Sequence, residues 1–181
     1  MKILIARYLS VVLKFLFSLR YGKRVVFGKR IILSPKFCFR GPGKLIIGDD
    51  VNLWTHNEMN GFFTFSPEAV ITVGDKCRLN GVTIQCRKAV TIGEECLLGS
   101  VMLIDNDFHS VHFEKRNDSS AIKSAPIVIG RRVWLAGQSA VLKGVTIGDE
   151  SVVGFRAVVT KDVPPKKIAA GNPAVVVKDT E

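Results

Sequence analysis

The chain has 181 residues, of which 47% are hydrophobic and 23% charged, and its formal net charge is +10. This length and composition fit one globular domain with a sizeable core and exclude a disordered chain. The positive charge suggests an anionic partner, such as anionic lipid or a polyphosphate cofactor. Nucleic acid would also fit the charge, but no recognised nucleic-acid-binding module occurs, so we expect no such partner.

Residues 1–24 are predicted to form a basic amphipathic helix. Arg7 and Lys14 interrupt the apolar run 3–19, so the uninterrupted stretches are too short to span a bilayer, and no small-residue cleavage site follows. On a helical wheel, one arc holds Lys2, Arg7, Ser10, Lys14, Ser18 and Arg20, and the opposite arc holds Leu4, Tyr8, Val11, Val12, Phe15, Leu16 and Leu19. Such a helix lies in the surface of an anionic membrane. The alternative is a helix packed on its own domain or on a neighbouring subunit. We therefore expect a cytoplasmic protein, with peripheral contact at the inner face of the cell membrane.

A six-residue repeat fills the body of the chain. Branched aliphatic residues recur at every sixth position, namely Ile129, Leu135, Val141, Ile147, Val153 and Val159. Ile92, Leu98 and Ile104 keep the same spacing earlier in the chain. A period of six is neither helical nor that of a simple strand. Six residues can form one short strand and a turn, and three such units close a triangular coil of about 18 residues.

This coil predicts the core and the domain boundaries. Ile129 is expected to stack on Ile147, and Leu135 on Val153, inside the prism. The small residue after each aliphatic turns the corner, where a Cβ would crowd or φ is positive. We predict an all-β, parallel β-helix over residues 25–178 with a short C-terminal cap and a tail at 179–181. The polar, unrepeated segment 107–125 is predicted to be an active-site loop, because long excursions from regular solenoids usually carry function.

The four cysteines, Cys38, Cys77, Cys86 and Cys96, form no CxxC pair and have no histidine at metal-ligand spacing. We expect reduced thiols that act as small hydrophobic side chains, and no metal site.

Several segments resemble the hexapeptide-repeat acyltransferases, and most of all the maltose and galactoside acetyltransferases and their relatives in polysaccharide biosynthesis. They are Pro126–Gly130, Val133–Gly137, Gly144–Gly148, Thr160–Pro165 and Ala169–Ala174. The resemblance is strong from about residue 71 to 178. It implies a left-handed coil, a homotrimer with active sites between subunits, acetyl-CoA as the donor and a saccharide as the acceptor.

Acetyl transfer to a hydroxyl needs a base, a donor for the oxyanion and a bound acceptor. Histidine suits the first role because its pKa is near neutral. His109 lies where the repeat gives way to the excursion, at the position where galactoside-type enzymes carry their catalytic histidine. The resemblance therefore implies that His109 is the general base, the alternative being a loop histidine. His112 is a candidate acceptor contact, and His56 is expected to be structural.

The resemblance also implies the residues that bind acetyl-CoA. Trp134 matches a position near the pantetheine arm, and Gly137 matches one whose N–H faces the thioester oxygen. Thr160 and Lys161 match positions that contact phosphate or pantetheine groups. Lys178 replaces an arginine that reaches the nucleotide phosphate, as a point charge without the arginine fork.

Some residues depart from the family pattern. Phe155 and Arg156 stand where small residues are usual, beside the expected pantetheine channel, and Arg156 either binds a phosphate or faces solvent. Arg87 replaces an acceptor-contacting carboxylate, so we expect a different acceptor. Asp105 and Asp107 flank the histidine and are expected to orient it or a sugar, unless they are simply solvated.

The sequence thus favours an acetyl-CoA-dependent O-acetyltransferase that acts on a saccharide or lipid-linked glycan in polysaccharide biosynthesis, by direct attack on the thioester. The amphipathic N-terminus supports this choice, because glycans are assembled on lipid carriers at a membrane surface. N-acetylation of an amino sugar or nucleotide sugar remains open. A non-catalytic β-helix scaffold is the alternative from another class.

Overall fold

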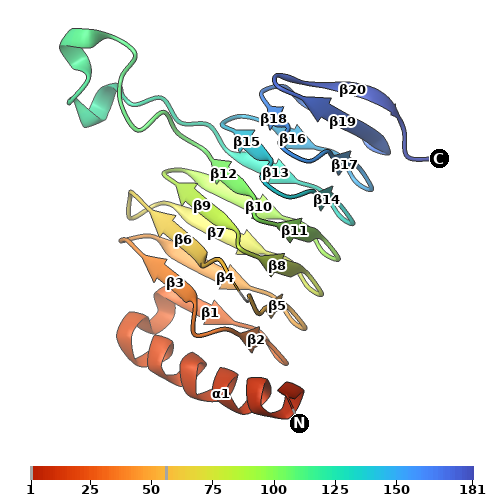
Figure 1. The fold of residues 1–181 in the computed structure, drawn as a ribbon. Helices are drawn as coiled ribbons and strands as arrows, with labels where there is room; N and C mark the ends of the chain where they lie inside the picture. Colours follow the sequence, from red (N-terminus) through yellow and green to blue (C-terminus); the bar gives the residue numbers. More distant parts are fainter. Residues whose placement is uncertain (1, 56) are drawn as a thin grey trace.

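The chain winds into a three-sided coil of parallel strands with a helix across one end (Figure 1). The computed structural model describes residues 2–55 and 57–181. Helix α1 (Lys2–Tyr21) and the short 3-10 helix η1 (Gly22–Arg24) lead into the first turn of the coil. The polar excursion carries two more 3-10 helices, η2 (Phe113–Lys115) and η3 (Ser119–Ala121).

Each side of the coil is one sheet. Sheet A contains β1 (Val25–Phe27), β4 (Lys44–Ile47), β7 (Val70–Val73), β10 (Ala89–Ile92), β13 (Ile127–Ile129) and β16 (Thr146–Ile147). Sheet B contains β2 (Ile32–Leu33), β5 (Asn52–Leu53), β8 (Arg78–Asn80), β11 (Leu97–Gly99), β14 (Trp134–Leu135), β17 (Val152–Val153), β19 (Lys167–Gly171) and β20 (Ala174–Asp179). Sheet C contains β3 (Phe37–Arg40), β6 (Asn60–Thr64), β9 (Thr83–Cys86), β12 (Met102–Ile104), β15 (Ala140–Leu142) and β18 (Val158–Val159).

The strand register confirms the stacking that the repeat predicted. Ile129 pairs with Ile147, and Leu135 with Val153, and all four side chains are buried. Burial of each such side chain contributes roughly 1.5–3 kcal/mol, so the column defines the register. The prediction that Ile104 points into the core was wrong, because Leu103 is the buried residue there. The corner that precedes Leu103 is one residue shorter than the corresponding corner in the next turn of the coil.

At the corners between sheets A and B, the crowded position and the position with positive φ are two different residues. The sequence pattern had predicted that the small residue after each aliphatic would meet both requirements. A Cβ on Gly93 would lie 2.6 Å from the carbonyl oxygen of Gly130, so glycine is needed for close approach of the next turn. The positive φ falls instead on a charged residue two positions later, as at Glu95 (59°) and Arg132 (55°). Glycine is therefore needed at these corners because a Cβ would clash with the next turn, whereas residues with full side chains adopt the left-handed conformation.

Helix α1 closes the open end of the first turn. The Leu33 N–H donates to Ser10 Oγ (2.8 Å), and Lys14 Nζ donates to the Gly28 carbonyl (2.9 Å). Tyr21 Oη donates to the Phe39 carbonyl at 2.6 Å. These bonds satisfy backbone groups that an open strand edge would leave unpaired. The helix thus packs on its own domain, as one of the two alternatives predicted.

The opposite end is closed by a hairpin, since β19 and β20 pair antiparallel at the edge of sheet B. This hairpin is the predicted C-terminal cap, and it includes Asp179, which the sequence analysis had placed in the tail. Within residues 2–55 and 57–181, no helix is long and apolar enough to cross a membrane.

Candidate active site

The excursion leaves the coil at the corner between sheets C and A and is closed at its neck by backbone hydrogen bonds. The Asp107 N–H donates to the Lys123 carbonyl (3.0 Å), and the Ala125 N–H donates to the Asp105 carbonyl (2.9 Å). In Figure 1 this segment projects away from the side of the coil between β12 and β13. The loop is therefore anchored at its base while its tip reaches outward.

Asp105 anchors the base of the loop and is completely buried. Its Oδ1 accepts the Arg87 N–H (2.6 Å), and its Oδ2 accepts the N–H groups of Lys88 (2.7 Å) and Ala89 (2.9 Å). The Cys86 thiol also donates to Oδ2 at 3.4 Å, and burial together with this carboxylate raises the pKa of Cys86. Because both oxygens of Asp105 are occupied inside the protein, the geometry favours a structural role for this residue over the expected contact with a sugar or with His109.

A tight turn presents His109. The Phe108 N–H donates to Asn106 Oδ1 (3.0 Å), and the His109 N–H donates to the Asp107 carbonyl (2.6 Å). Phe108 has a φ of 59°, an uncommon conformation for a bulky residue that the surrounding structure must maintain. Asn106 is a positioning residue that the sequence analysis missed, although asparagine between two aspartates is a typical signal for a side-chain-capped turn.

The His109 ring is oriented by a carbonyl from within the same loop. His109 Nδ1 lies 3.1 Å from the carbonyl oxygen of Arg116, and the side chain is exposed. A proton on Nδ1 can donate to this oxygen, which leaves a lone pair on Nε2 for an incoming proton. Asp107 does not orient the ring, because its carboxylate pairs with Lys143.

Two other predicted residues lie on or against this loop. Arg87 Nη2 donates to the Ser119 carbonyl at 2.9 Å and so ties the excursion to the coil. His112 is exposed, three residues beyond His109, and its backbone N–H donates to Ser110 Oγ at 3.2 Å.

A second group of predicted residues lies on sheet B and at its corner with sheet C. The Trp134 side chain is 49% exposed and, with Leu97 and Gly137, lines a hollow of about 450 Å³ on the outer face of the sheet. The Gly137 N–H has no acceptor among the described residues, whereas the N–H groups of Ala136 and Gln138 donate to Val153 and Ser100. This hollow therefore offers an aromatic wall beside an available backbone donor.

Phe155 and Arg156 border the same corner. The Phe155 ring lies close to Gly137, since a Cβ on that glycine would come within 3.5 Å of it. The Arg156 guanidinium lies 5.1 Å above the Phe155 ring, and its Nε donates to Gln138 Oε1 at 2.7 Å. Both side chains are exposed, so they widen the polar and aromatic surface next to the hollow.

A single chain does not bring the two groups together. His109 projects from the corner between sheets C and A, whereas Trp134 and Gly137 belong to sheet B and its corner with sheet C. The width of sheet C separates them. Thr160 and Lys161 follow β18 on the same edge as His109, and Lys178 lies on β20; all three are exposed.

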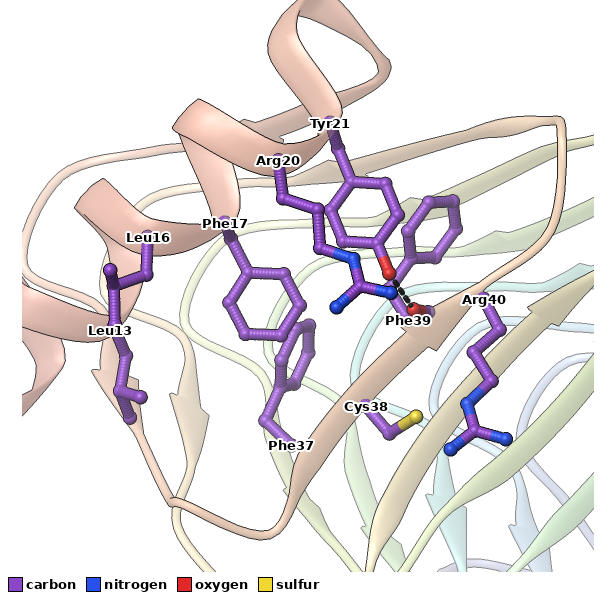
Figure 2. Close-up of a pocket in the computed structure, with 9 residues that line it drawn as sticks. All are labelled: Leu13, Leu16, Phe17, Arg20, Tyr21, Phe37, Cys38, Phe39 and Arg40. Carbon is purple, nitrogen blue, oxygen red and sulfur yellow. Dashed lines mark hydrogen bonds between the residues drawn. The ribbon is translucent and has the colours of Figure 1, made fainter.

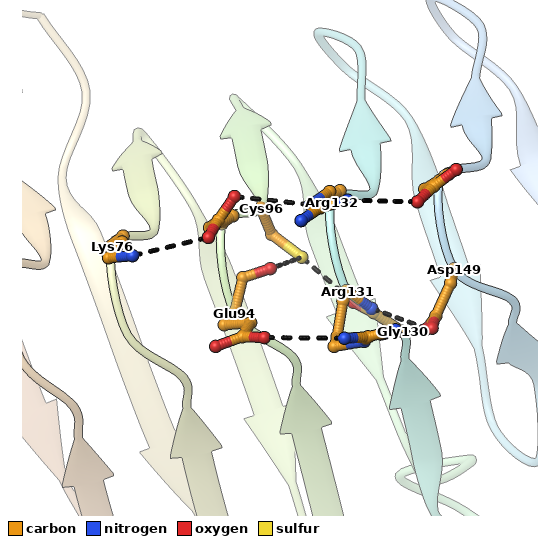
Figure 3. Close-up of polar contacts among 9 residues, drawn as sticks. Lys76, Glu94, Cys96, Gly130, Arg131, Arg132 and Asp149 are labelled. Atoms are coloured by element: carbon orange, nitrogen blue, oxygen red, sulfur yellow. Dashed lines mark hydrogen bonds and ion pairs between the residues drawn. The ribbon is translucent and has the colours of Figure 1, made fainter.

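The third edge of the coil, between sheets A and B, carries alternating charges (Figure 3). Arg132 bridges Glu95 (3.3 Å) and Glu150 (3.2 Å), and Arg131 contacts Asp149 at 3.1 Å. The backbone N–H of Arg131, and then its guanidinium, lower the pKa of Asp149. Because these charges neutralise one another in rows along the edge, this surface is a weak candidate for binding an anionic ligand.

The cysteines are free thiols, as predicted, and Cys77, Cys86 and Cys96 are buried. In the described ranges, no group of three or more His, Cys, Asp or Glu side chains converges as a metal site would require. The structural role expected for His56 concerns a residue outside the described part of the chain.

Comparisons of the sequence and of the structure with known proteins point to the same family. Residues 126–161 match the model of the hexapeptide repeat of succinyl-transferase. The putative colanic acid biosynthesis acetyltransferase WcaF of Escherichia coli K12 is 33% identical over 165 residues, which cover 88% of this chain and 70% of that protein. The galactoside O-acetyltransferase of the same strain is 38% identical over 116 residues, which cover 64% of this chain and 57% of the relative.

A solved galactoside acetyltransferase in complex with coenzyme A matches with a TM-score of 0.61 and 31% identity, covering 86% of this chain and 65% of the other. The parallel three-sided coil and its interrupting loop define a left-handed β-helix of the acyltransferase type. The chain belongs to the hexapeptide-repeat acetyltransferase family.

Proposed function

We propose that this protein transfers the acetyl group of acetyl-CoA to a hydroxyl of a saccharide, with His109 as the general base. The observation that carries the proposal is the bond between His109 Nδ1 and the Arg116 carbonyl, which leaves Nε2 available. The names of the relatives support the class of acceptor, since one is a galactoside O-acetyltransferase and another belongs to colanic acid biosynthesis. The coenzyme A bound by the solved relative supports the donor.

The chemistry follows from these groups. His109 Nε2 takes the proton of the acceptor hydroxyl as its oxygen attacks the thioester carbonyl. The Gly137 N–H, which has no acceptor among the described residues, donates to the developing oxyanion. When the carbon–sulfur bond breaks, the coenzyme A thiolate regains the proton from His109. The products are an O-acetyl ester and the free thiol.

We assign the donor to the surface around the sheet B hollow. Trp134 and Phe155 supply exposed aromatic faces for the pantetheine arm. Arg156 beside the hollow and Lys178 on β20 supply positive charge for the phosphates. Thr160 and Lys161 lie on the same edge as His109, so they supply a hydroxyl and a further positive charge from the copy that contributes His109. Because His109 lies across sheet C from this hollow, the complete site forms where His109 of one copy meets the hollow of the next. A homotrimer closes such a head-to-tail contact into a ring.

The acceptor is assigned to the excursion, where Arg87, Asp107 and His112 surround the base of the loop and its exposed rim. Arg87 and Asp107 also hold the loop in place, so their substitution affects both loop order and acceptor binding. The acceptor class is a saccharide or lipid-linked glycan of polysaccharide biosynthesis.

The first test is thiol release from acetyl-CoA in the presence of sugars, amino sugars, nucleotide sugars and lipid-linked glycans. His109→Ala is expected to lower kcat by roughly 10²–10⁴, because general-base catalysis contributes about that factor. His112→Ala is the matched control, and we expect it to raise the acceptor KM while retaining most of kcat.

A near-normal kcat in His109→Ala would show that His109 is not the general base. An amide product from an amino sugar would replace O-transfer by N-transfer. If no acceptor supports thiol release and calorimetry detects no coenzyme A binding, the protein is instead a non-catalytic scaffold.

A further inference from the structure

The outward face of helix α1 is strongly apolar. The exposed fractions are 61% for Ile5, 77% for Tyr8, 67% for Val11, 62% for Phe15, 52% for Leu16 and 68% for Leu19. Single exposed apolar residues are common, but a continuous stripe along one helix usually marks a docking surface. We call these residues, together with Val12, the α1 stripe.

The stripe faces outward because the other side of the helix is committed to closing the coil. Phe17 packs between Tyr21, Phe27 and Phe37, with ring centroids 5.0–6.2 Å away. Ser10 and Lys14, which the helical wheel assigned to the polar arc, bond to backbone groups of the first turn. Part of the polar arc therefore faces the protein, while the α1 stripe packs against no other element among the described residues.

The charge around the stripe has one sign. Residues 1–48 contain no Asp or Glu, and their basic residues are Lys2, Arg7, Lys14, Arg20, Lys23, Arg24, Lys29, Arg30, Lys36, Arg40 and Lys44. The first acidic residue is Asp49, in the second turn of the coil. This end of the protein is thus apolar on its outermost helix and basic in the residues that surround it.

A groove of about 290 Å³ between α1 and β3 adds a second feature (Figure 2). Leu13, Leu16 and Phe17 from the helix and Phe37 from the strand give it an apolar lining, and Arg20 and Arg40 line it as well. An apolar lining with two guanidinium groups suits a phosphate attached to a hydrocarbon chain.

We propose that this end of the coil docks on the surface of an anionic phospholipid bilayer. The α1 stripe enters the boundary between headgroups and acyl chains, and Arg20, Arg40 and the surrounding basic residues contact lipid phosphates. A second copy is a poorer occupant, because an end-to-end contact would bring two strongly basic surfaces together. Residues 1–48 carry no carboxylate, and one of their eleven basic residues, Arg30, forms an ion pair with Asp50. The inference stands on α1 and the first turn of the coil, and does not depend on the transfer reaction.

The test is flotation of the full-length protein with vesicles of phosphatidylcholine alone or with phosphatidylglycerol added. We expect binding to the anionic vesicles only, weakened by salt. Phe15→Glu with Leu19→Glu is expected to lower the partition coefficient more than about 10-fold, since it removes apolar insertion and adds repulsion. The matched control is Val175→Glu with Val177→Glu on β20, which changes two exposed valines at the opposite end and should bind like the parent.

A second variant separates charge from insertion. Arg7→Gln with Lys23→Gln removes two exposed charges and should weaken binding about 30-fold at low salt, at roughly 1 kcal/mol for each basic residue. Equal flotation of the parent and the α1 variant, or no flotation of the parent, would overturn the proposal. It would also be overturned if the α1 variant lowered the oligomeric state, because the stripe would then be an interface between copies.

Discussion

Asp105→Asn offers a direct test of how the candidate active-site loop is anchored. The carboxylate accepts three backbone N–H groups at 2.6–2.9 Å in a fully buried position. An asparagine oxygen can retain the Arg87 N–H, but its NH₂ group would face the donors of Lys88 and Ala89. The substitution therefore loses two charge-assisted bonds and leaves donors facing one another.

Each hydrogen bond to a charged group contributes about 1.5–3 kcal/mol, so the two lost bonds should cost about 3 kcal/mol or more of unfolding free energy. For a chain of this length, 3 kcal/mol corresponds to a Tm lower by about 6–12 °C. Urea unfolding and thermal unfolding, followed by circular dichroism at equal protomer concentration, measure both quantities.

Asp162→Asn is the matched control. Asp162 is another corner carboxylate between sheets C and A, but it is exposed and accepts one backbone N–H, that of Thr146 at 2.7 Å. Water can replace that single bond, so its Tm should fall far less. Equal shifts for the two variants would refute the structural role assigned to Asp105.

Two further predictions concern the coil and its assembly. Gly93→Ala should destabilise the protein by about 1–3 kcal/mol in urea unfolding, because its Cβ would meet backbone of the next turn at 2.6 Å. Gly99→Ala, with open space at that position, should be neutral or slightly stabilising, and a similar cost for both would contradict the crowding argument. If the site forms between copies, mixing inactive His109→Ala and Trp134→Ala chains during assembly should restore about a quarter of the sites, measured by thiol release. No recovery above the separate variants would place the whole site within one chain.

The coil could be predicted from the sequence because the buried residues that define it recur at a fixed period along the chain. A branched aliphatic at every sixth position can be buried only if six residues make one side of the coil, and Ile129 and Leu135 stack on Ile147 and Val153 accordingly. Where a corner is one residue shorter, the simple period failed and Leu103 replaced Ile104 in the core. The period thus determines the architecture, and small changes in corner length decide individual inward positions.

The candidate site was only partly readable. The family resemblance singled out His109, but the group that orients its ring is the Arg116 carbonyl, and every residue carries a carbonyl. Asp105 looked like a functional carboxylate because nothing in the local sequence shows that it is buried beneath three backbone N–H groups. Backbone partners and burial depend on which turns of the coil lie next to each other, so they emerge only in the folded chain.

Helix α1 shows the same division most clearly. The sequence by itself determined that this segment is helical, basic and two-sided. The tertiary structure decided which side is buried, because the open edge of the first turn presents unpaired backbone groups that Ser10, Lys14 and Tyr21 satisfy. Aromatic packing by Phe17 completes that inward face, and the larger apolar stripe is left outside. A helical wheel gives the two faces of a helix, but only the strand edge beneath it selects the face that turns inward.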